Sequence, residues 1–389
     1  MALATLTAAS VPLACASEGE HEPEPGVEPA TAPDGSADAR DTDDGGGATS
    51  DSATLDAGPC SSSKLCVAAI PTDETVRLTD LWGSGATDVW AVGTRGTILH
   101  YDGATWEKAD PVAPEGGAGF TLRSVWLERP DDVWIADGHS IWHGTGWKGP
   151  HASDWSFVVA SEDEPAPTAI RGRGRTVFIA RSMRGANPFY SIQGWLSATD
   201  GWTDAGLETI PIFAEYFLTF NAIAVSRQDE AWALADVFSS EGYVYRIGRP
   251  SDPASESPWQ VEEYDFKSST RRALGVWGDD SAVWLVGTKG LLRRITRSAV
   301  PSKSFEIVES PVRADLHDVF GFGPADVWAV GEASTVLHWD GNAWTKVSTP
   351  FDHLNETERP TFESIWGSSP TDIWIAGDGT MVHFDGGAQ

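Results

Sequence analysis

Residues 78–106 read LTDLWGSGATDVWAVGTRGTILHYDGATW, and residues 316–344 read LHDVFGFGPADVWAVGEASTVLHWDGNAW, so the two stretches align without a gap. A third copy, FESIWGSSPTDIWIAGDGTMVHFDGG, covers residues 362–387. Alignment on the tryptophan of the DVW element gives seven repeats, spaced by 44, 44, 54, 52, 44 and 46 residues. Their anchors are Trp90, Trp134, Phe178, Trp232, Trp284, Trp328 and Trp374. A period of this length indicates a repeat architecture.

Each copy contains short apolar runs separated by turn residues, and none sustains a helical period over ten residues. In the first copy we predict strands over 78–83, 89–93 and 97–101 and a fourth strand from Trp106. Four antiparallel strands in each of seven repeats predict an all-β fold, a seven-bladed β-propeller over residues 64–389. The last copy ends before its outer strand, and we expect residues 64–70 to supply that strand and close the ring.

The first 63 residues have the composition of an unfolded segment. They hold 12 Asp and Glu against one Arg, Arg40, and the first aromatic residue of the chain is Trp82. We therefore expect a disordered acidic linker over residues 17–63. Residues 1–16, MALATLTAASVPLACA, are typical of a signal peptide. Two processing sites compete, cleavage after Ala16 or lipidation of Cys15 in a lipobox-like sequence with Pro12 in the usual Leu place; an Ala-rich unstructured start is the third alternative.

The formal charge is −30, from 57 Asp and Glu against 27 Lys and Arg. This balance argues against a nucleic-acid partner, since the binding of phosphate groups depends on clustered Lys and Arg side chains. No run of 18 apolar residues occurs, so we expect membrane contact only through a lipid anchor at Cys15. We expect a monomer outside the cytoplasm, either secreted or anchored in the outer membrane and the cell envelope.

Cys60 and Cys66 lie six positions apart in PCSSSKLC. Because two sulfurs without a nearby His make a poor zinc site, we predict a disulfide at the junction of linker and propeller.

The repeats resemble those of Asp-box and two-component-sensor-like propellers. They resemble more closely the DVWAVG…GTILHYDG…W repeats of secreted proteins and lipoproteins of myxobacteria. The resemblance covers residues 64–389, well in repeats one, two, five, six and seven and poorly in three and four. In Tyr101–Trp106 the Asp and Gly are adjacent, unlike the S-x-D-x-G-x-x-W box of sialidases, which argues against glycosidase activity.

Positions that recur in every blade are expected to be structural. Most tryptophans recur on three positions, which predicts packing between sheets. The histidines of the third strand, His100, His143, His338 and His383, recur likewise. We expect Asp88, Asp132, Asp326 and Asp372 to accept backbone hydrogen bonds in the preceding turn, and Asp102, Asp340 and Asp385 to do so in Asp-Gly turns.

Function is sought where equivalent positions differ. The second residue of the inner strand reads Thr79, Arg123, Asn221, Leu274, His317 and Glu363, and the third reads Asp80, Ser124, Ala222, Gly275, Asp318 and Ser364. Because strand residues alternate, only one series is expected to face the channel. We predict a binding site at the channel mouth from Arg123, Asn221, His317 and Glu363; the alternative is a solvated channel that tolerates polar residues.

Insertions in repeats three and four, over 183–194, 206–216 and 239–259, predict long loops on the binding face. The RGRGR stretch with Arg171, Arg173 and Arg175 forms a basic patch, either an acidic-ligand site or a solvated hairpin.

No catalytic, metal or cofactor motif occurs in the chain. We therefore expect a non-enzymatic binding module for a protein or glycan. The alternatives are a sialidase-like hydrolase or lyase acting on polysaccharide, and a purely structural spacer.

Overall fold

The computed structural model describes residues 59–110, 120–150, 155–158, 166–174, 176–182, 192–196, 218–237, 241–250, 259–266, 268 and 270–386. All of them belong to one compact unit, Thr54–Gln389. The predictions of a signal peptide, of lipidation at Cys15 and of an acidic linker up to residue 58 concern residues outside this part of the chain. No helix among the described residues is long and apolar enough to cross a membrane.

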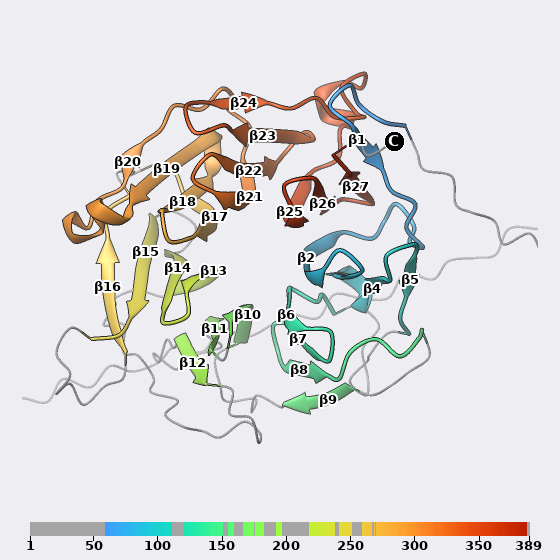
Figure 1. Cartoon of the computed structure of the whole chain (residues 1–389), viewed down its shortest axis with the longest axis horizontal. Coiled ribbons are helices and arrows are strands. Elements are labelled where there is room, and N and C mark those ends of the chain that lie inside the picture. The colour runs from blue at the N-terminus through green and yellow to red at the C-terminus, as the bar shows by residue number, and fades with distance from the viewer. Residues whose placement is uncertain are drawn as a thin grey trace, which may run out of the picture. The chain divides into compact units, whose positions relative to one another are not determined.

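The described residues form seven antiparallel sheets (Figure 1). The innermost strands are β2 (Leu78–Gly85), β6 (Ser124–Arg129), β10 (Ala166–Arg173), β13 (Leu218–Arg227), β17 (Ala273–Gly278), β21 (Leu316–Gly323) and β25 (Phe362–Ser369). The second strands are β3 (Asp88–Gly93), β7 (Asp132–Ala136), β11 (Thr176–Ser182), β14 (Glu230–Val237), β18 (Ala282–Gly287), β22 (Asp326–Gly331) and β26 (Asp372–Gly377). Each innermost strand contacts that of the next repeat, and β25 contacts β2, so the ring is closed.

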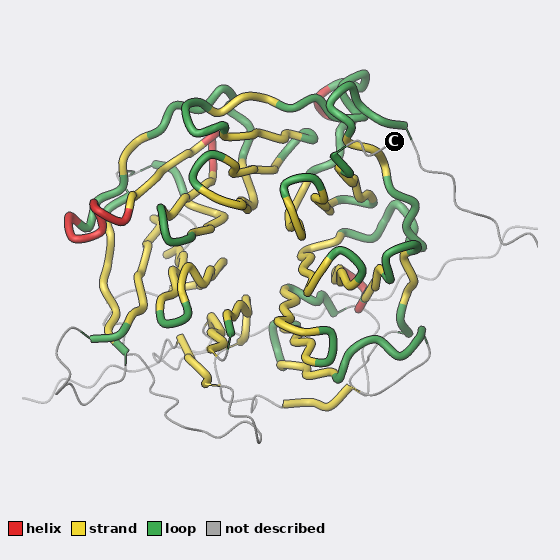
Figure 2. The backbone as a smooth tube through the Cα atoms, in the orientation of Figure 1, coloured by secondary structure: helices red, strands yellow, loops and turns green. Residues whose placement is uncertain are grey.

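Two further strands lie outside this pair in most sheets. The third strands are β4 (Ile98–Tyr101), β8 (Ile141–Gly144), β12 (Ile192–Leu196), β15 (Glu241–Gly248), β19 (Leu291–Thr296), β23 (Thr335–Trp339) and β27 (Thr380–Phe384). The outer strands are β5 (Trp106–Lys108), β9 (Trp155–Val158), β16 (Gln260–Tyr264), β20 (Glu306–Ile307), β24 (Trp344–Lys346) and β1 (Leu65–Val67). Four short 3-10 helices lie in the connections between described strands (Figure 2). They are η1 (Thr94–Gly96), η2 (Thr288–Gly290), η3 (Arg297–Ser302) and η4 (Glu356–Glu358).

The propeller prediction is confirmed, with one correction to its blades. Six sheets have four strands, whereas the sheet of the third repeat, β10-β11-β12, has three described strands. Seven four-stranded blades were expected, and the structure shows six. The third repeat departs most from the pattern, with Phe178 in place of the second-strand tryptophan. The residues that follow its last strand, 197–217, lie outside the described residues.

The loops predicted in repeats three and four are partly wrong. Residues 192–196 form β12 and residues 241–248 form β15, because apolar and aromatic residues there extend the sheets instead of leaving them. The remaining inserted residues lie outside the part that the structure describes, apart from 249–250 and Trp259.

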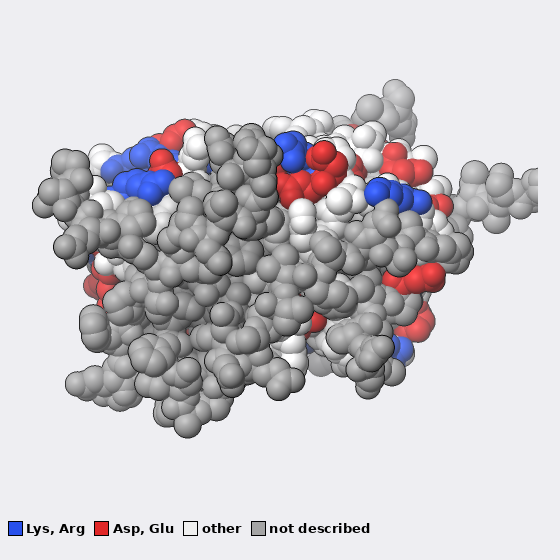
Figure 3. All heavy atoms as spheres, turned by 90° about the horizontal axis from the view of Figure 1, so that it is seen from below, with Lys and Arg blue, Asp and Glu red and all other residues white. Residues whose placement is uncertain are grey.

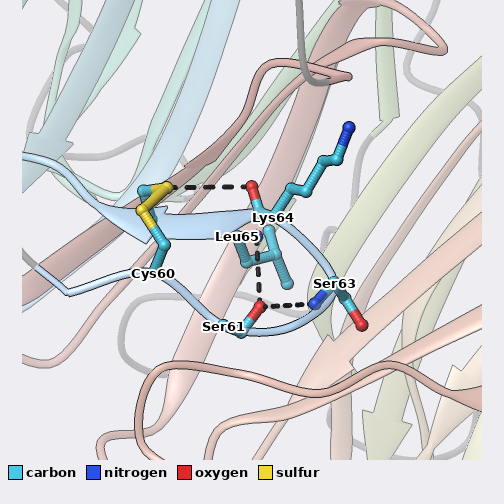
Figure 4. Close-up of a disulfide and its surroundings, with 6 residues drawn as sticks. Cys60, Ser61, Ser63, Lys64 and Leu65 are labelled. Carbon is cyan, nitrogen blue, oxygen red and sulfur yellow. Dashed lines mark hydrogen bonds between the residues drawn. A yellow bond between two sulfur atoms is a disulfide. The ribbon is translucent and has the colours of Figure 1, made fainter. Parts of the chain in front are cut away.

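The closing strand is confirmed. β1 pairs antiparallel with β27, Leu65 opposite Phe384 and Val67 opposite Val382, and completes the last sheet. Leu65 is fully buried among residues of the last two repeats. The predicted Cys60–Cys66 disulfide is present and joins Cys60, which precedes this strand, to Cys66 within it (Figure 4). Within its loop, Ser61 Oγ accepts hydrogen bonds from the backbone N–H groups of Ser63 and Leu65, both at 3.2 Å.

The recurring Asp, Trp and His residues form one hydrogen-bonded unit inside a blade. Asp132 Oδ1 accepts hydrogen bonds from Trp134 Nε1 and His143 Nε2, both at 2.8 Å. The same unit occurs at Asp88, Trp90 and His100 and at Asp326, Trp328 and His338, while Asp372 binds His383 at 2.7 Å. The prediction that these aspartates accept backbone hydrogen bonds is therefore wrong. Strand pairing places the His directly opposite the Trp, so the side chains are closer to the carboxylate than the turn is.

The fourth repeat keeps this unit with different residues. Glu230 takes the place of the Asp and Arg246 that of the His, with Arg246 Nε 2.7 Å from Glu230 Oε2 and Trp232 Nε1 3.1 Å from Glu230 Oε1. Burial alone would raise the pKa of Glu230, but hydrogen bonds and charge from Ser226, Arg297 and Arg246 lower it to about 2. The Glu230 carboxylate is therefore a structural group that hydrogen bonds and ion pairs hold inside the blade.

The glycine that ends the DVWAVG element is required by a close approach. A Cβ at Gly93, Gly331 or Gly377 would collide with the carbonyl oxygen of Arg77, Asp315 or Thr361 in the segment that enters the same sheet. The predicted Asp-Gly turns are confirmed at Asp102 and Asp340, whose Oδ1 atoms each accept two backbone hydrogen bonds at 2.8–2.9 Å.

Candidate functional site: a central channel with two unlike ends

A cavity of about 590 Å³ occupies the centre of the ring. The innermost strands of all seven sheets contribute to its wall. The structure places all four predicted residues, Arg123, Asn221, His317 and Glu363, on this wall. These residues come from repeats up to 240 positions apart in sequence, and the closed ring brings them to one cavity.

The expectation that only one series of inner-strand residues faces the channel is wrong. Both the second and the third residue line the cavity, as in Thr79 and Asp80 or His317 and Asp318. The reason is a β-bulge at the start of the inner strands, between Leu78 and Asp80, Leu316 and Asp318, and Phe362 and Ser364. A bulge inserts one residue and breaks the strict alternation of side chains.

At one end of the channel, called here the charged mouth, polar residues of the second series are held in pairs. His317 Nδ1 lies 3.1 Å from Glu363 Oε2, and Arg77 forms an ion pair with the other oxygen of Glu363. Burial lowers the pKa of His317, but the Glu363 partner outweighs it and the net shift is upward. Burial alone raises the pKa of Glu363, yet His317 and Arg77 lower it overall. Both shifts favour the charged forms of the pair, a protonated His317 beside an ionised Glu363.

Asn221 and Arg123 complete the charged mouth in different ways. Asn221 Nδ2 donates to Asp236 Oδ2 at 2.6 Å, and Arg272 Nη1 donates to the same oxygen at 2.9 Å. Arg123 is exposed, and its guanidinium has no hydrogen bond or ion pair with any residue that the structure describes. Arg123 is therefore available to an anionic group of a ligand.

The middle of the channel, its waist, contains a buried ion pair that sequence reasoning missed. Arg171 binds the Asp80 carboxylate with two hydrogen bonds, Nη1–Oδ2 at 2.9 Å and Nη2–Oδ1 at 2.8 Å. Its Nη1 also donates to Ser124 Oγ at 2.8 Å. The sequence predicted Arg171 in a basic patch or a solvated hairpin. This prediction is wrong, because Arg171 lies on β10, the innermost strand of the third sheet. It pairs with Phe178 as Trp82 pairs with Trp90, so it occupies the inner-strand tryptophan position.

Side chains of the third series join neighbouring sheets. Asp80 accepts a hydrogen bond from Val125 N at 2.9 Å, Ser124 from Ile170 N at 3.2 Å, Asp318 from Ile365 N at 3.0 Å and Ser364 from Leu81 N at 3.3 Å. Each is a bond to the inner strand of the next repeat. Ala222 and Gly275 occupy this position in repeats four and five and offer no such acceptor. We call these four contacts the staples; they run from repeat six through seven, one and two to three.

Asp318 and Asp80 share one hydroxyl. Ser364 Oγ lies 3.1 Å from both Asp80 Oδ1 and Asp318 Oδ2. One hydroxyl hydrogen satisfies only one of the two carboxylates at a time. Burial raises the pKa of Asp318 to about 6, against the lowering effects of Ile365 N–H and the Arg171 charge and with a contribution from the Asp80 charge. The waist therefore carries a carboxylate that is costly to ionise.

The end of the channel beyond the waist, the aromatic end, is lined by rings. Phe320 contacts Trp82, Trp277, Phe322 and Trp366, with ring centroids 5.4–6.5 Å apart. Trp82, Trp277, Phe320 and Phe322 are all partly exposed on the cavity wall. The Arg171 guanidinium lies 4.7 Å from the centre of the Trp82 ring. Trp82, Trp277, Phe320 and Trp366 lie two positions after the third series and Phe322 lies four positions after it, so the alternation of side chains along the strand places them on the same wall.

The described residues contain no group of three or more His, Cys, Asp or Glu that could hold a metal ion. On the face in Figure 3, basic and acidic side chains of the described residues lie beside one another.

Comparison with known proteins supports the fold. No family model matches the sequence, and no curated protein matches it. Among solved structures, YCF48 from Cyanidioschyzon merolae is 18% identical, with a TM-score of 0.60 over 83% of this chain and 99% of its own. YCF48 bound to a D1 peptide is 16% identical, with a TM-score of 0.59 over 82% of this chain and 96% of its own. The extracellular domain of the hybrid two-component system BT4673 from B. thetaiotaomicron is 12% identical, with a TM-score of 0.57 over 82% of this chain and 39% of that one. The chain is thus similar to β-propellers of several kinds.

Proposed function

We propose that this chain is a non-catalytic propeller that recognises a protein or glycan ligand at its charged mouth. The observation that carries the proposal is that Arg123, Asn221, His317 and Glu363, which break the repeat pattern, line one cavity. Repeated positions maintain the scaffold, whereas these four residues give one mouth an uneven set of charges and hydrogen-bonding groups. The Arg123 guanidinium, which pairs with no residue that the structure describes, is the first candidate for contact with a ligand.

The comparisons agree with a binding role. One similar propeller, YCF48, has a solved structure with a peptide, and another is the extracellular domain of a sensor system. A disulfide in a chain of this kind favours an oxidising compartment, and we propose an extracytoplasmic location, secreted or anchored at Cys15.

The waist carboxylates favour binding over the hydrolase alternative. A retaining glycosidase needs two carboxyl groups about 5–5.5 Å apart that are free to act as nucleophile and acid. Asp80 is engaged by Arg171, by the backbone N–H groups of Leu81 and Val125 and by Ser364. A carboxylate with both oxygens occupied by the fold is a poor nucleophile.

The test incubates the full chain with arrays of peptides and with bacterial and plant polysaccharides. Binding is measured as depletion of protein from solution, and catalysis as released reducing ends. We expect at least one class of ligand to bind and no product to appear. The joint variant Arg123→Ala/His317→Ala/Glu363→Ala should weaken binding at least tenfold. The matched control, Glu107→Ala/Lys108→Ala on the exposed strand β5, should bind like the parent.

Two outcomes would contradict the proposal. Released reducing ends would make the chain an enzyme. Binding that survives the triple substitution unchanged would remove the charged mouth from recognition, provided that the variant melts like the parent.

A further inference from the structure

The two ends of the channel differ in their balance of charge. At the charged mouth, basic and acidic groups are balanced, because Arg77, Arg123 and Arg272 lie with the carboxylates of Glu363, Asp236 and Asp378, and His317 adds positive charge when protonated. From the waist to the aromatic end, four carboxylates, Asp80, Asp318, Glu128 and Asp279, face two guanidinium groups, Arg171 and Arg173. The second half of the channel therefore has an excess of negative charge.

This excess is not neutralised within the waist. Arg171 is taken by Asp80 through two hydrogen bonds, and Arg173 Nη1 donates to the carbonyl oxygen of Ser226 at 2.7 Å. Asp318 forms no ion pair with a described residue. Within the described part of the chain, its oxygens accept hydrogen bonds only from backbone N–H groups and the shared Ser364 hydroxyl. The Arg171 charge acts on Asp318 without a direct ion pair. A buried carboxylate that is not directly paired with a cation favours either a proton or a cationic ligand.

The rings beside this carboxylate suit a cation. Asp318 and Phe320 lie on one strand and on the same wall, and Phe320 contacts the rings of Trp82 and Trp277. The faces of aromatic rings attract ammonium and guanidinium groups, most strongly where water is excluded. The existing contact of Arg171 with Trp82 shows this geometry on the same wall.

We propose that the aromatic end of the channel binds the cationic side chain of a lysine or arginine in a peptide ligand, with Asp318 as its counter-ion and Trp82, Trp277 and Phe320 around it. The proposal rests on the proposed binding role and assigns a chemical class to the part of the channel opposite the charged mouth. An extended peptide side chain presents its charge on an apolar stem, which matches rings at the entrance and a carboxylate deeper in.

The experiment measures binding of three peptides, Ac-GGRGG-NH2, Ac-GGKGG-NH2 and Ac-GGQGG-NH2, to the full chain by isothermal titration calorimetry at pH 7.5. Two separate variants test the site, Asp318→Asn and Trp277→Leu, so that one remains if the other fails to fold. Glu107→Gln is the matched control, because it removes one acidic charge from the exposed outer strand β5. Methylguanidinium and tetramethylammonium are added as competitors.

We expect one or both basic peptides to bind at least tenfold more tightly than the glutamine peptide. Each site variant should lose at least tenfold, and Glu107→Gln should lose less than twofold. Competition by the free cations would show that the charge itself is recognised. Basic peptides that bind no better than the glutamine peptide, or that bind both site variants like the parent, would overturn the proposal and indicate general attraction to an acidic protein.

The triple variant of the charged mouth separates this proposal from the previous one. Basic-peptide binding that survives in the triple variant supports the aromatic site even if no ligand for the charged mouth is found. Ligand binding at the charged mouth with no response to basic peptides refutes only the aromatic site.

Discussion

At the scale of single residues, one extra amino acid per strand sets the character of the channel. The bulge at the start of β2, β21 and β25 places two consecutive side chains on the cavity wall. One of them, such as Glu363, is free to vary, while the next, such as Ser364, joins the neighbouring sheet. Strict alternation would have forced a choice between a binding surface and an inter-sheet contact.

Asp318 should make stability depend on pH in an unusual direction. Its pKa is raised to about 6 in the folded state from 3.8, so the folded chain holds a proton that the unfolded chain has lost between about pH 4 and pH 6. The contribution of this group to the free energy of unfolding therefore falls as the pH rises through this window, by about 3 kcal/mol at most.

The measurement compares Asp318→Asn with the parent by urea unfolding at pH 4, 5, 6 and 7. As the pH rises from about 4 to about 6, the free energy of unfolding of the parent should fall relative to that of the variant. A difference that stays constant with pH would show that the pKa of Asp318 is the same in the folded and the unfolded chain. Groups with lowered pKa, such as Glu230 at about 2, act in the opposite direction below pH 4.5 and cancel in this comparison.

At the scale of strands, the ion pair of Asp80 and Arg171 links the innermost strands β2, β6 and β10. Removal of one partner from a buried ion pair typically costs 3–5 kcal/mol, because the other charge stays buried. We expect Asp80→Ala to lose about that much of the free energy of unfolding, measured by chemical denaturation. The double variant Asp80→Ser/Arg171→Trp gives both positions the residues of neighbouring repeats and should recover part of the loss. A loss below about 1 kcal/mol for Asp80→Ala would mean that Arg171 finds water or another partner.

The strands themselves were predictable from the sequence, whereas the side-chain contacts between sheets were not. The DVWAVG element fixes β3 and β22 because its alternation and its final glycine are local properties. The Asp, Trp and His unit was detectable as a recurring set, although its hydrogen bonds were assigned to the wrong partners. Arg171 gave no local signal, since its partner Asp80 lies 91 positions earlier in another repeat. The mouth residues were found because they vary where the scaffold repeats.

At the scale of the whole molecule, the ring depends on a strand from the start of the propeller. β1 completes the sheet of β25, β26 and β27, and without it β27 would present an open edge. We expect deletion of residues 64–70 to remove most of the free energy of unfolding and to lower the melting temperature sharply in calorimetry.

Two comparisons make this deletion informative. Deletion of seven residues further upstream, 41–47, should leave the melting temperature unchanged. The variant Cys60→Ser/Cys66→Ser keeps β1 in place and should lose only about 2 kcal/mol, the entropy of a small closed loop. A 64–70 deletion that melts like the parent would show that the ring closes without β1.

The staples are unevenly distributed around the ring, and this has a consequence for how the chain could be rearranged. They span the seam where β1 meets β27 and are missing around repeats four and five. Because the two ends of the propeller lie on paired strands, a circular permutant could join them and begin elsewhere. New termini between repeats four and five would leave every staple within an unbroken arc, whereas termini between six and seven would cut the arc in two. In the chain as it is, the ring is interrupted between β27 and β1, within the arc that the staples hold together.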